Sequence, residues 1–337
     1  MIIPSRRTSN FHYAIRNVVD AAESLRRSGR EVIYLNIGDP QAFGFRPPDH
    51  VVEVVQRALA HRFTGYAHSA GLKEARESVA AYSAALGAPT SPDNVIMTSG
   101  ASEAADLVLT ALVDTEDEVL MPAPGYPLYP AILSKLGARA RYYKLEEKSS
   151  WQPDIDEITS LIGERTRALL LVNPNNPTGT ITRDETTIRL LELAAEHNLL
   201  VIADEVYREL CFGVPPTSAS VLAGTIGTPV VTLESLSKTH LIPGWRVGWM
   251  RLTHAENMRE LISAITKLAS GRLCAPTPSQ YAVRPALEGE RGFLDDFIQA
   301  IKRRRDFAVA RISEIKGLSC VAPEAAFYLM VKADGVG

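Results

Sequence analysis

Short apolar runs alternate with amphipathic stretches through the middle of the chain, between about residues 51 and 252. Apolar runs of this length are typical of strands buried on both faces. Their alternation with helical patterns indicates a mostly parallel sheet that is covered on both sides. We therefore predict an α/β fold with seven strands in one sheet, at residues 95–97, 118–121, 140–145, 168–172, 200–203, 230–233 and 247–251.

The segments between the strands predict helices. Residues 72–86 are amphipathic, and Thr182 followed by Glu185 forms a capping-box pattern that predicts the start of a helix over 182–197. A longer amphipathic helix is predicted at about 293–315, with a run of basic residues on its polar face. We expect every connection between consecutive strands to be a strand–helix crossover.

The two ends of the chain predict a second, smaller lobe. We assign residues 45–288 to a large domain and residues 1–44 together with 289–337 to a small domain. The last apolar run, 326–331, predicts a strand, and the sequence ends shortly after it. We therefore expect the small domain to be incomplete at its C-terminal side.

Composition narrows the range of partners. The net charge is −3 and the charges of both signs are interspersed, whereas a nucleic-acid or anionic-membrane surface is typically strongly basic. No apolar run approaches the roughly 20 residues needed to cross a bilayer, and the N-terminal residues lack the apolar core of a signal peptide. The three cysteines show no metal-ligand spacing. We expect a cytoplasmic protein with a small-molecule partner and no metal.

Chemically unusual residues follow the first two predicted strands. Ligands of open α/β sheets bind beyond the carboxyl ends of the strands. After the first strand, Gly100, Ala101 and Ser102 open a helix and leave backbone N–H groups free for a phosphate, although small residues also begin many helices that bind nothing. After the second, the proline-stiffened loop PAPGYPLYP presents Tyr126, which can lie on a planar ring or simply form a surface turn.

The fourth and fifth strands end in polar side chains. The fourth runs into NPNNPTG, residues 173–179, a rigid turn whose Asn176 can donate to a phenolate oxygen. The fifth ends at Asp204 in the sequence DEVY. A carboxylate at the end of a buried strand needs a cationic or strongly donating partner to stay ionised, and a protonated ring nitrogen is such a partner.

The sixth strand leads to Ser235, Ser237 and Lys238, and Arg246 follows in GWRVG. A lysine beside hydroxyl groups, followed by an arginine whose fork suits a phosphate, matches the requirements of a covalently held phosphorylated aldehyde. Any one of these residues could be an ordinary loop or surface residue. Their joint occurrence at successive strand ends is what predicts a cofactor site.

The motifs NPNNPTG, DEVY, SLSK and GWRVG, together with LNIGDP at 35–40, resemble those of the fold-type I, class I/II aminotransferases. The segments GASEA, WQPDIDEI and RLCAPTPSQ look most like the alanine-aminotransferase branch. The resemblance covers nearly the whole chain. It implies an aspartate-aminotransferase-like fold with a seven-stranded sheet in a large domain, a smaller α+β domain, pyridoxal 5′-phosphate (PLP) as cofactor, and a homodimer.

The resemblance also implies a role for each motif residue. Lys238 would bind PLP as a Schiff base and act as the catalytic base, and Asp204 would pair with the ring nitrogen. Asn176 and Tyr207 would hold the ring oxygen, and Tyr126 would stack on the ring.

The remaining roles concern the phosphate, the substrate and the partner subunit. Tyr66 would reach the phosphate of the neighbouring subunit, and Gly38 and Asn176 would contact the bound amino acid. The phosphate contacts would come from Gly100, Ala101, Ser102, Ser235, Ser237 and Arg246.

The implied reaction is transamination between an L-amino acid and a 2-oxo acid, with alanine or glutamate and pyruvate or 2-oxoglutarate as the expected pairs. Other PLP chemistry, such as a C–S lyase or decarboxylase reaction, and a catalytically impaired PLP-binding module remain alternatives. Family members continue beyond the position of Gly337 and carry there the arginine that clamps the substrate carboxylate. Arg272 and Arg284 are conceivable substitutes, without a positional argument, and we expect weak activity from this form.

Overall fold

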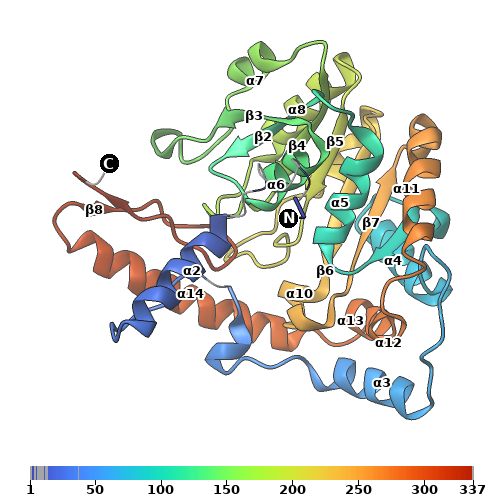
Figure 1. Cartoon of the computed structure of the whole chain (residues 1–337), viewed down its shortest axis with the longest axis horizontal. Coiled ribbons are helices and arrows are strands. Elements are labelled where there is room, and N and C mark those ends of the chain that lie inside the picture. The colour runs from blue at the N-terminus through green and yellow to red at the C-terminus, as the bar shows by residue number, and fades with distance from the viewer. Residues whose placement is uncertain (1, 4, 6–10, 12–13, 37, 336–337) are drawn as a thin grey trace.

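The computed structural model describes residues 2–3, 5, 11, 14–36 and 38–335, and a seven-stranded sheet forms the centre of the molecule (Figure 1). The strand order is β1-β7-β6-β5-β4-β2-β3. The strands are β1 (Val95–Thr98), β2 (Glu118–Ala123), β3 (Arg139–Lys144), β4 (Thr166–Val172), β5 (Leu200–Asp204), β6 (Val230–Ser235) and β7 (Gly248–Thr253). All seven predicted strands are confirmed, each within two residues of its predicted ends.

One predicted connection is wrong. Strands β2 to β6 pair in parallel, whereas β7 is antiparallel to both β1 and β6. The segment between β6 and β7 holds only the short α10 (Leu236–Thr239) and η5 (Pro243–Trp245), which is not a helical crossover. An apolar run indicates that a strand is buried but not in which direction it runs.

Helices cover both faces of the sheet. The helices other than α10 are α2 (Ala14–Arg27), α3 (Asp49–Ala60), α4 (Lys73–Ala85), α5 (Ala101–Leu112), α6 (Leu128–Leu136), α7 (Ile155–Leu161), α8 (Asp184–Glu196), α9 (Ala219–Leu222), α11 (Arg259–Gly271), α12 (Thr277–Gln280), α13 (Val283–Glu288) and α14 (Gly292–Ser313). None of the helices in the described ranges is both long and apolar enough to span a membrane.

The alternation of side chains along β4 shows how the sheet is buried. Leu170 packs in a core with α5, α6 and α11, whereas Leu169 and Leu171 pack in a second core with α7, α8 and α9. A fully buried leucine contributes about 1.5–3 kcal/mol relative to an exposed one. Burial on both faces therefore explains why these strands read as continuous apolar runs.

The predicted capping box is wrong. Helix α8 begins at Asp184, its N-cap residue is Arg183, and the cap has no side-chain hydrogen bond. Thr182 is used elsewhere, because its backbone N–H donates to Asn173 Oδ1 at 3.0 Å and its carbonyl accepts from Asn173 Nδ2 at 3.2 Å. These bonds close the NPNNPTG turn before the helix starts.

The predicted strand at 326–331 is also wrong. The segment is irregular, and the strands of this region are instead β8 (Leu318–Ser319) and β9 (Lys332–Ala333), which pair antiparallel. Ala326 adopts a left-handed conformation at φ 60°, and its N–H donates to the carbonyl of Leu210 at 2.8 Å. The segment is therefore attached to a distant loop, away from the edge of any strand.

Helices α2 and α14 and the β8–β9 pair lie together beside one end of the sheet, at the lower left of Figure 1. Helix α14 confirms the predicted long helix, and its Leu294 and Phe297 pack with Tyr207 and Leu210 in a small core next to the strand ends. Part of the predicted small domain, including residues 6–10 and 336–337, lies outside the described residues.

Candidate active site

A cavity of about 240 Å³ lies at the carboxyl ends of β4, β5 and β6. The structure brings together in its wall ten of the residues that the sequence singled out: Ala101, Ser102, Tyr126, Asn176, Asp204, Tyr207, Ser235, Ser237, Lys238 and Arg246. Three others do not line it. Gly100 lies against the guanidinium group of Arg246, and the carbonyl of Gly38 accepts a hydrogen bond from Lys238. Tyr66 is 84% exposed on the surface.

Lys238 is positioned by α10, the single helical turn that follows β6. Its Nζ donates to the carbonyl oxygen of Gly38 at 3.1 Å and lies 5.4 Å from the centre of the Phe327 ring. Burial lowers the pKa of this amine, Asp39 opposes the shift, and Arg246 adds to it. A lowered pKa leaves more of the neutral amine, which is the form that acts as nucleophile or base.

A cradle for a phosphate is formed where α5 meets Arg246. The first backbone N–H groups of α5, at Ala101 and Ser102, have no acceptor within their own helix. Arg246 donates from Nη2 to the Ser99 carbonyl at 3.0 Å. A Cβ at Gly100 would lie 2.5 Å from that Nη2, so only glycine lets the guanidinium approach this closely.

Two serines complete the cradle. Ser235 caps α10, accepting from the N–H of Ser237 at 3.0 Å, and its Oγ lies 2.7 Å from Ser237 Oγ. A Cβ at Gly248 would come within 2.6 Å of the backbone carbon of Gly100. The beginning of β7 and the loop after β1 are therefore in close contact, which holds the serines and the α5 N-terminus on one side of the cavity.

Asp204 ends β5 and is buried with its carboxylate toward the cavity. Burial raises its pKa, and hydrogen bonds from Tyr129 Oη at 2.6 Å and the Val206 N–H at 3.2 Å oppose the shift. Within the described ranges no basic side chain forms an ion pair with it. The carboxylate is therefore available to a cationic group of a ligand.

Asn176 and Tyr207 lie on the two loops that follow β4 and β5 and line the cavity. The Tyr207 hydroxyl lies 2.6 Å from the hydroxyl of Tyr328. Burial raises the pKa of Tyr207 well above its usual value, so that this side chain stays a protonated donor. Tyr126 meets the ring of Tyr129 edge to face, with 6.3 Å between ring centres.

Sequence reasoning missed Tyr129 and Tyr328. Tyr129 lies in the same motif as Tyr126, three residues on, and that spacing at a helix start indicates a shared face. Tyr328 comes from the segment predicted as a strand. Its contact with Tyr207 spans 121 residues of sequence, and no local pattern signals it.

Neither substitute considered for the carboxylate-binding arginine lines the cavity. Arg272 pairs with Glu103, with Nε to Oε1 at 3.0 Å, and donates to the Met97 carbonyl at 2.7 Å. Arg284 is an exposed residue paired with Glu288.

These residues fit PLP in three respects. The glycine-lined cradle suits a phosphate, the unpaired buried carboxylate of Asp204 suits a protonated ring nitrogen, and the Lys238 amine suits an aldehyde. The fold and the cavity together define a PLP-dependent enzyme of the aspartate-aminotransferase type.

The chain belongs to the aminotransferase class I and II family, whose signature matches residues 30–336. It is 36% identical to the glutamate-pyruvate aminotransferase AlaA of Escherichia coli K12, over 98% of this chain and 82% of that protein. It is 36% identical to an alanine aminotransferase of Mycobacterium tuberculosis H37Rv, over 96% of this chain and 76% of that protein.

Solved structures agree with the fold. An alanine aminotransferase from Pyrococcus furiosus superposes with a TM-score of 0.95 at 37% identity, covering 99% of this chain and 85% of that one. An aspartate aminotransferase from Thermus thermophilus superposes with a TM-score of 0.88 at 30% identity, covering 98% of this chain and 85% of that one. The aspartate-aminotransferase-like fold and the PLP dependence implied by the motifs are confirmed.

Proposed function

We propose that this chain transfers the amino group between L-alanine and 2-oxoglutarate, forming pyruvate and L-glutamate, and catalyses the reverse reaction. The observation that carries the proposal is the meeting of two side chains in one cavity of an aminotransferase fold: the Lys238 amine, whose pKa is lowered by burial, and the buried carboxylate of Asp204, which has no cation beside it. The names of the similar E. coli and M. tuberculosis enzymes support the choice of alanine and glutamate.

We assign the cavity residues as follows. PLP, when bound, supplies an electron sink for the negative charge that develops at the substrate Cα. Lys238 Nζ binds the aldehyde covalently and, once displaced by the substrate amine, takes the proton from Cα. Asp204 holds the positive charge of the ring nitrogen, Asn176 and Tyr207 bind the ring oxygen, and Tyr126 covers the ring.

The other residues bind the ends of the ligands. The phosphate is held by the α5 N-terminus with the side chains opposite it, and the bound amino acid is contacted by Gly38 and Asn176. The proposed phosphate set is Gly100, Ala101, Ser102, Ser235, Ser237 and Arg246.

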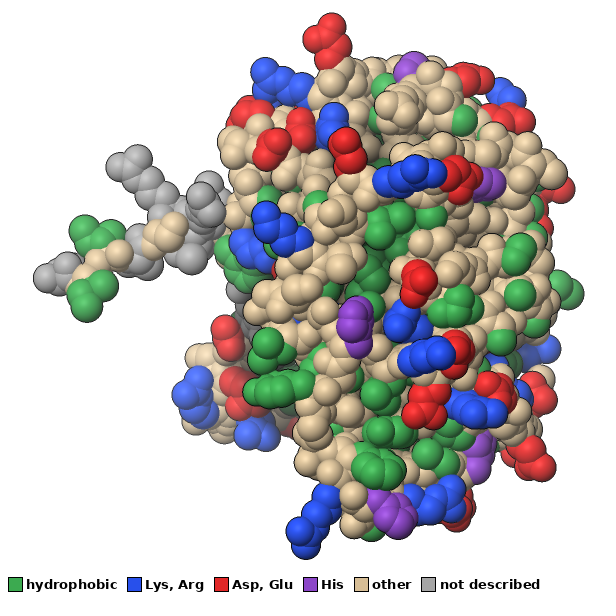
Figure 2. Space-filling model, turned by 90° about the vertical axis from the view of Figure 1, so that its right-hand side faces the viewer, with side chains coloured by type: hydrophobic (Ala, Val, Ile, Leu, Met, Phe, Trp, Pro, Cys, Tyr) green, Lys and Arg blue, Asp and Glu red, His purple; other side chains and the backbone are tan. Residues whose placement is uncertain are grey.

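We also propose a homodimer in which Tyr66 enters the partner's cavity. Tyr66 is 84% exposed and is absent from the wall of the cavity in its own chain. The Oγ atoms of Ser69 and Ser270 lie 3.3 Å apart, which places the Tyr66 loop beside the end of α11, just before the exposed Leu273. Figure 2 shows the side of the molecule on which α11 and α4 lie, with hydrophobic side chains along its middle among charges of both signs.

The domain division and the location complete the proposal. Three of the apolar cores are built only from residues between 51 and 286, which supports a large domain at 45–288 and a small domain from 1–44 and 289–337. We place the enzyme in the cytoplasm, because its proposed substrates are water-soluble metabolites.

A spectral half-reaction tests the proposed activity. The PLP-loaded protein is mixed with single amino acids, and conversion to the pyridoxamine form is followed by absorbance. We expect conversion with L-alanine and L-glutamate, and a loss of about 1,000-fold or more in the rate for Lys238→Ala. Release of thiol, ammonia or carbon dioxide without an acceptor acid would instead indicate a lyase or a decarboxylase.

A further inference from the structure

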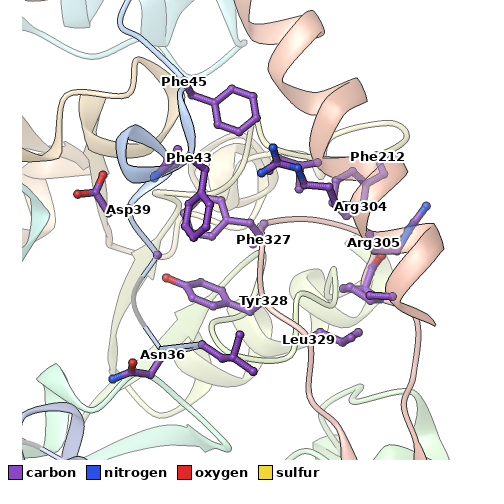
Figure 3. Close-up of a pocket in the computed structure, with 17 residues that line it drawn as sticks. Asn36, Asp39, Phe43, Phe45, Phe212, Arg304, Arg305, Phe327, Tyr328 and Leu329 are labelled. Atoms are coloured by element: carbon purple, nitrogen blue, oxygen red, sulfur yellow. Dashed lines mark hydrogen bonds between the residues drawn. The ribbon is translucent and has the colours of Figure 1, made fainter. Parts of the chain in front are cut away.

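Tyr328 lies in the wall of two cavities. It lines the Lys238 cavity and also a second cavity of about 280 Å³ between residues 35–45 and α14. Figure 3 shows this second cavity, with the Tyr328 hydroxyl pointing away from Arg304 and Arg305. That hydroxyl lies 2.6 Å from the hydroxyl of Tyr207.

Backbone hydrogen bonds hold the segment that carries Tyr328. The N–H groups of Glu324 and Ala325 both donate to the carbonyl of Gly179, at 2.9 Å each. The N–H of Ala326 donates to Leu210 at 2.8 Å. These acceptors belong to the same two loops that carry Asn176 and Tyr207, so the position of Tyr328 is fixed relative to both.

Side-chain packing also fixes the Tyr328 ring. It lies 5.6 Å from the Tyr207 ring and 5.1 Å from the Phe327 ring, measured between centres. A Cβ at Gly38 would lie 2.9 Å from the Tyr328 hydroxyl and 2.4 Å from Phe327. A larger residue at position 38 would therefore push on both rings, and Ala326 keeps a left-handed backbone, φ 60°, in the same turn.

The number of hydrogens on the two hydroxyl groups decides which tyrosine donates the hydrogen bond between them. A phenol has one hydrogen to donate and lone pairs that accept. In the proposed function the Tyr207 hydroxyl donates its hydrogen to the ring oxygen of PLP. The hydrogen between the two phenols must then come from Tyr328. A hydroxyl that accepts a hydrogen bond donates more strongly, so such a chain strengthens the bond from Tyr207 to the ring oxygen.

We propose that Tyr328 is a positioning residue for PLP, which donates to Tyr207 and thereby directs the Tyr207 hydrogen to the ring oxygen of the cofactor. This inference rests on the proposed function, because it takes the assignment of Tyr207 from it. It adds a residue that acts on the ring oxygen of PLP through Tyr207.

A double-mutant cycle of PLP binding tests the inference. The apparent PLP dissociation constant is measured for the full chain, for Tyr328→Phe, for Tyr207→Phe and for the double variant. One buried hydrogen bond contributes about 0.5–1.5 kcal/mol, so we expect Tyr328→Phe to weaken PLP binding about fivefold in the wild-type background. In the Tyr207→Phe background we expect no further change, because the two hydroxyls act in series.

Two controls separate this role from a structural one. Tyr143→Phe removes another buried phenol hydroxyl, which donates to the Leu170 carbonyl at 2.9 Å away from the cavity, and should leave PLP binding unchanged. With 3-deoxypyridoxal 5′-phosphate, which lacks the ring oxygen, wild type and Tyr328→Phe should bind equally.

The outcomes are distinct. An equal loss from Tyr328→Phe in both backgrounds, or unchanged binding in the wild-type background, would overturn the role of Tyr328 and leave the proposed function intact. Failure of the wild-type chain to bind PLP at all would refute the proposed function itself.

Discussion

Asp204 and Glu205 are neighbours at the end of β5, yet their carboxylates have different partners. Asp204 faces the cavity and accepts a hydrogen bond from the neutral phenol of Tyr129. Glu205 lies 3.3 Å from Arg208 and 3.7 Å from Arg251, measured from Oε2 to the guanidinium nitrogens. The charge of Glu205 is balanced by arginine side chains of the protein, whereas the charge of Asp204 is not.

Glu205 belongs to a buried network centred on Arg251, which is fully buried on β7. Arg251 Nε contacts Glu234 Oε2 at 2.7 Å, and its Nη groups donate to Ser220 at 2.6 Å and Ser218 at 2.9 Å. Burial raises the pKa of Glu205, and the two arginines oppose the shift. Two guanidinium groups and two carboxylates balance, so this network needs no ligand.

The difference indicates which acid serves a ligand. Burial raises the pKa of Asp204 as well, and only neutral donors oppose it. A buried carboxylate with no cation is costly unless something else supplies the positive charge. The contrast between adjacent residues therefore supports the proposed pairing of Asp204 with a cationic ring nitrogen better than either residue does alone.

We expect the largest effect from removing Arg251, and we expect it to lower the stability of the folded chain. Arg251→Met leaves Glu205 and Glu234 without their shared cation, and we expect the free energy of unfolding to fall by about 3–5 kcal/mol in urea denaturation. Arg165→Met, which removes an exposed pair with Glu116, should change it by less than about 1 kcal/mol. Equal effects of the two variants would contradict the account.

Asp204→Asn should affect activity and spare folding. The amide keeps the shape but not the charge, so we expect the transamination rate to fall by about 100-fold or more. The raised pKa means that the folded carboxyl binds its proton more tightly than the unfolded one. Wild type therefore loses stability as the pH rises through the window above about 3.9, and the variant does not. In a urea titration at neutral pH, Asp204→Asn should be at least as stable as wild type. A lower stability of the variant would contradict the claim that the buried charge of Asp204 destabilises the folded chain.

Tyr129→Phe should have a smaller effect on the same acid. Without the donor at 2.6 Å, the pKa of Asp204 rises further, so the acid limb of the kcat/KM profile moves to higher pH. A hydrogen bond to a charged group contributes about 1.5–3 kcal/mol, which corresponds to a shift of about 1–2 pH units. The control Tyr143→Phe should leave the limb in place, and an unshifted limb in Tyr129→Phe would show that Tyr129 does not tune Asp204.

Most of the sheet and most of the cavity wall could be predicted from the sequence. Strands buried on both faces give continuous apolar runs, and the residues after them, such as Asn176, Asp204 and Lys238, meet at one edge because parallel strands end there. Tyr129 could also have been predicted, because it follows Tyr126 by three residues.

The rest depends on contacts that local sequence does not encode. Thr182 fails to cap α8 because Asn173 binds its backbone. The 326–331 segment forms no strand, because the N–H of Ala326 donates to Leu210 and the two residues just before it donate to Gly179. Such long-range backbone bonds also place Tyr328 in the site. The reversed direction of β7 is likewise set by its partners β1 and β6.

Chemical mapping of the bound cofactor tests the central claim most directly. The chain is loaded with PLP, reduced with borohydride and digested, and the modified peptide is identified by mass spectrometry. We predict one pyridoxyl group per chain, on Lys238, and none at that stoichiometry in Lys238→Ala. Labelling spread over exposed lysines such as Lys73, whose side chain is 80% exposed, with Lys238 unmodified, would contradict the account.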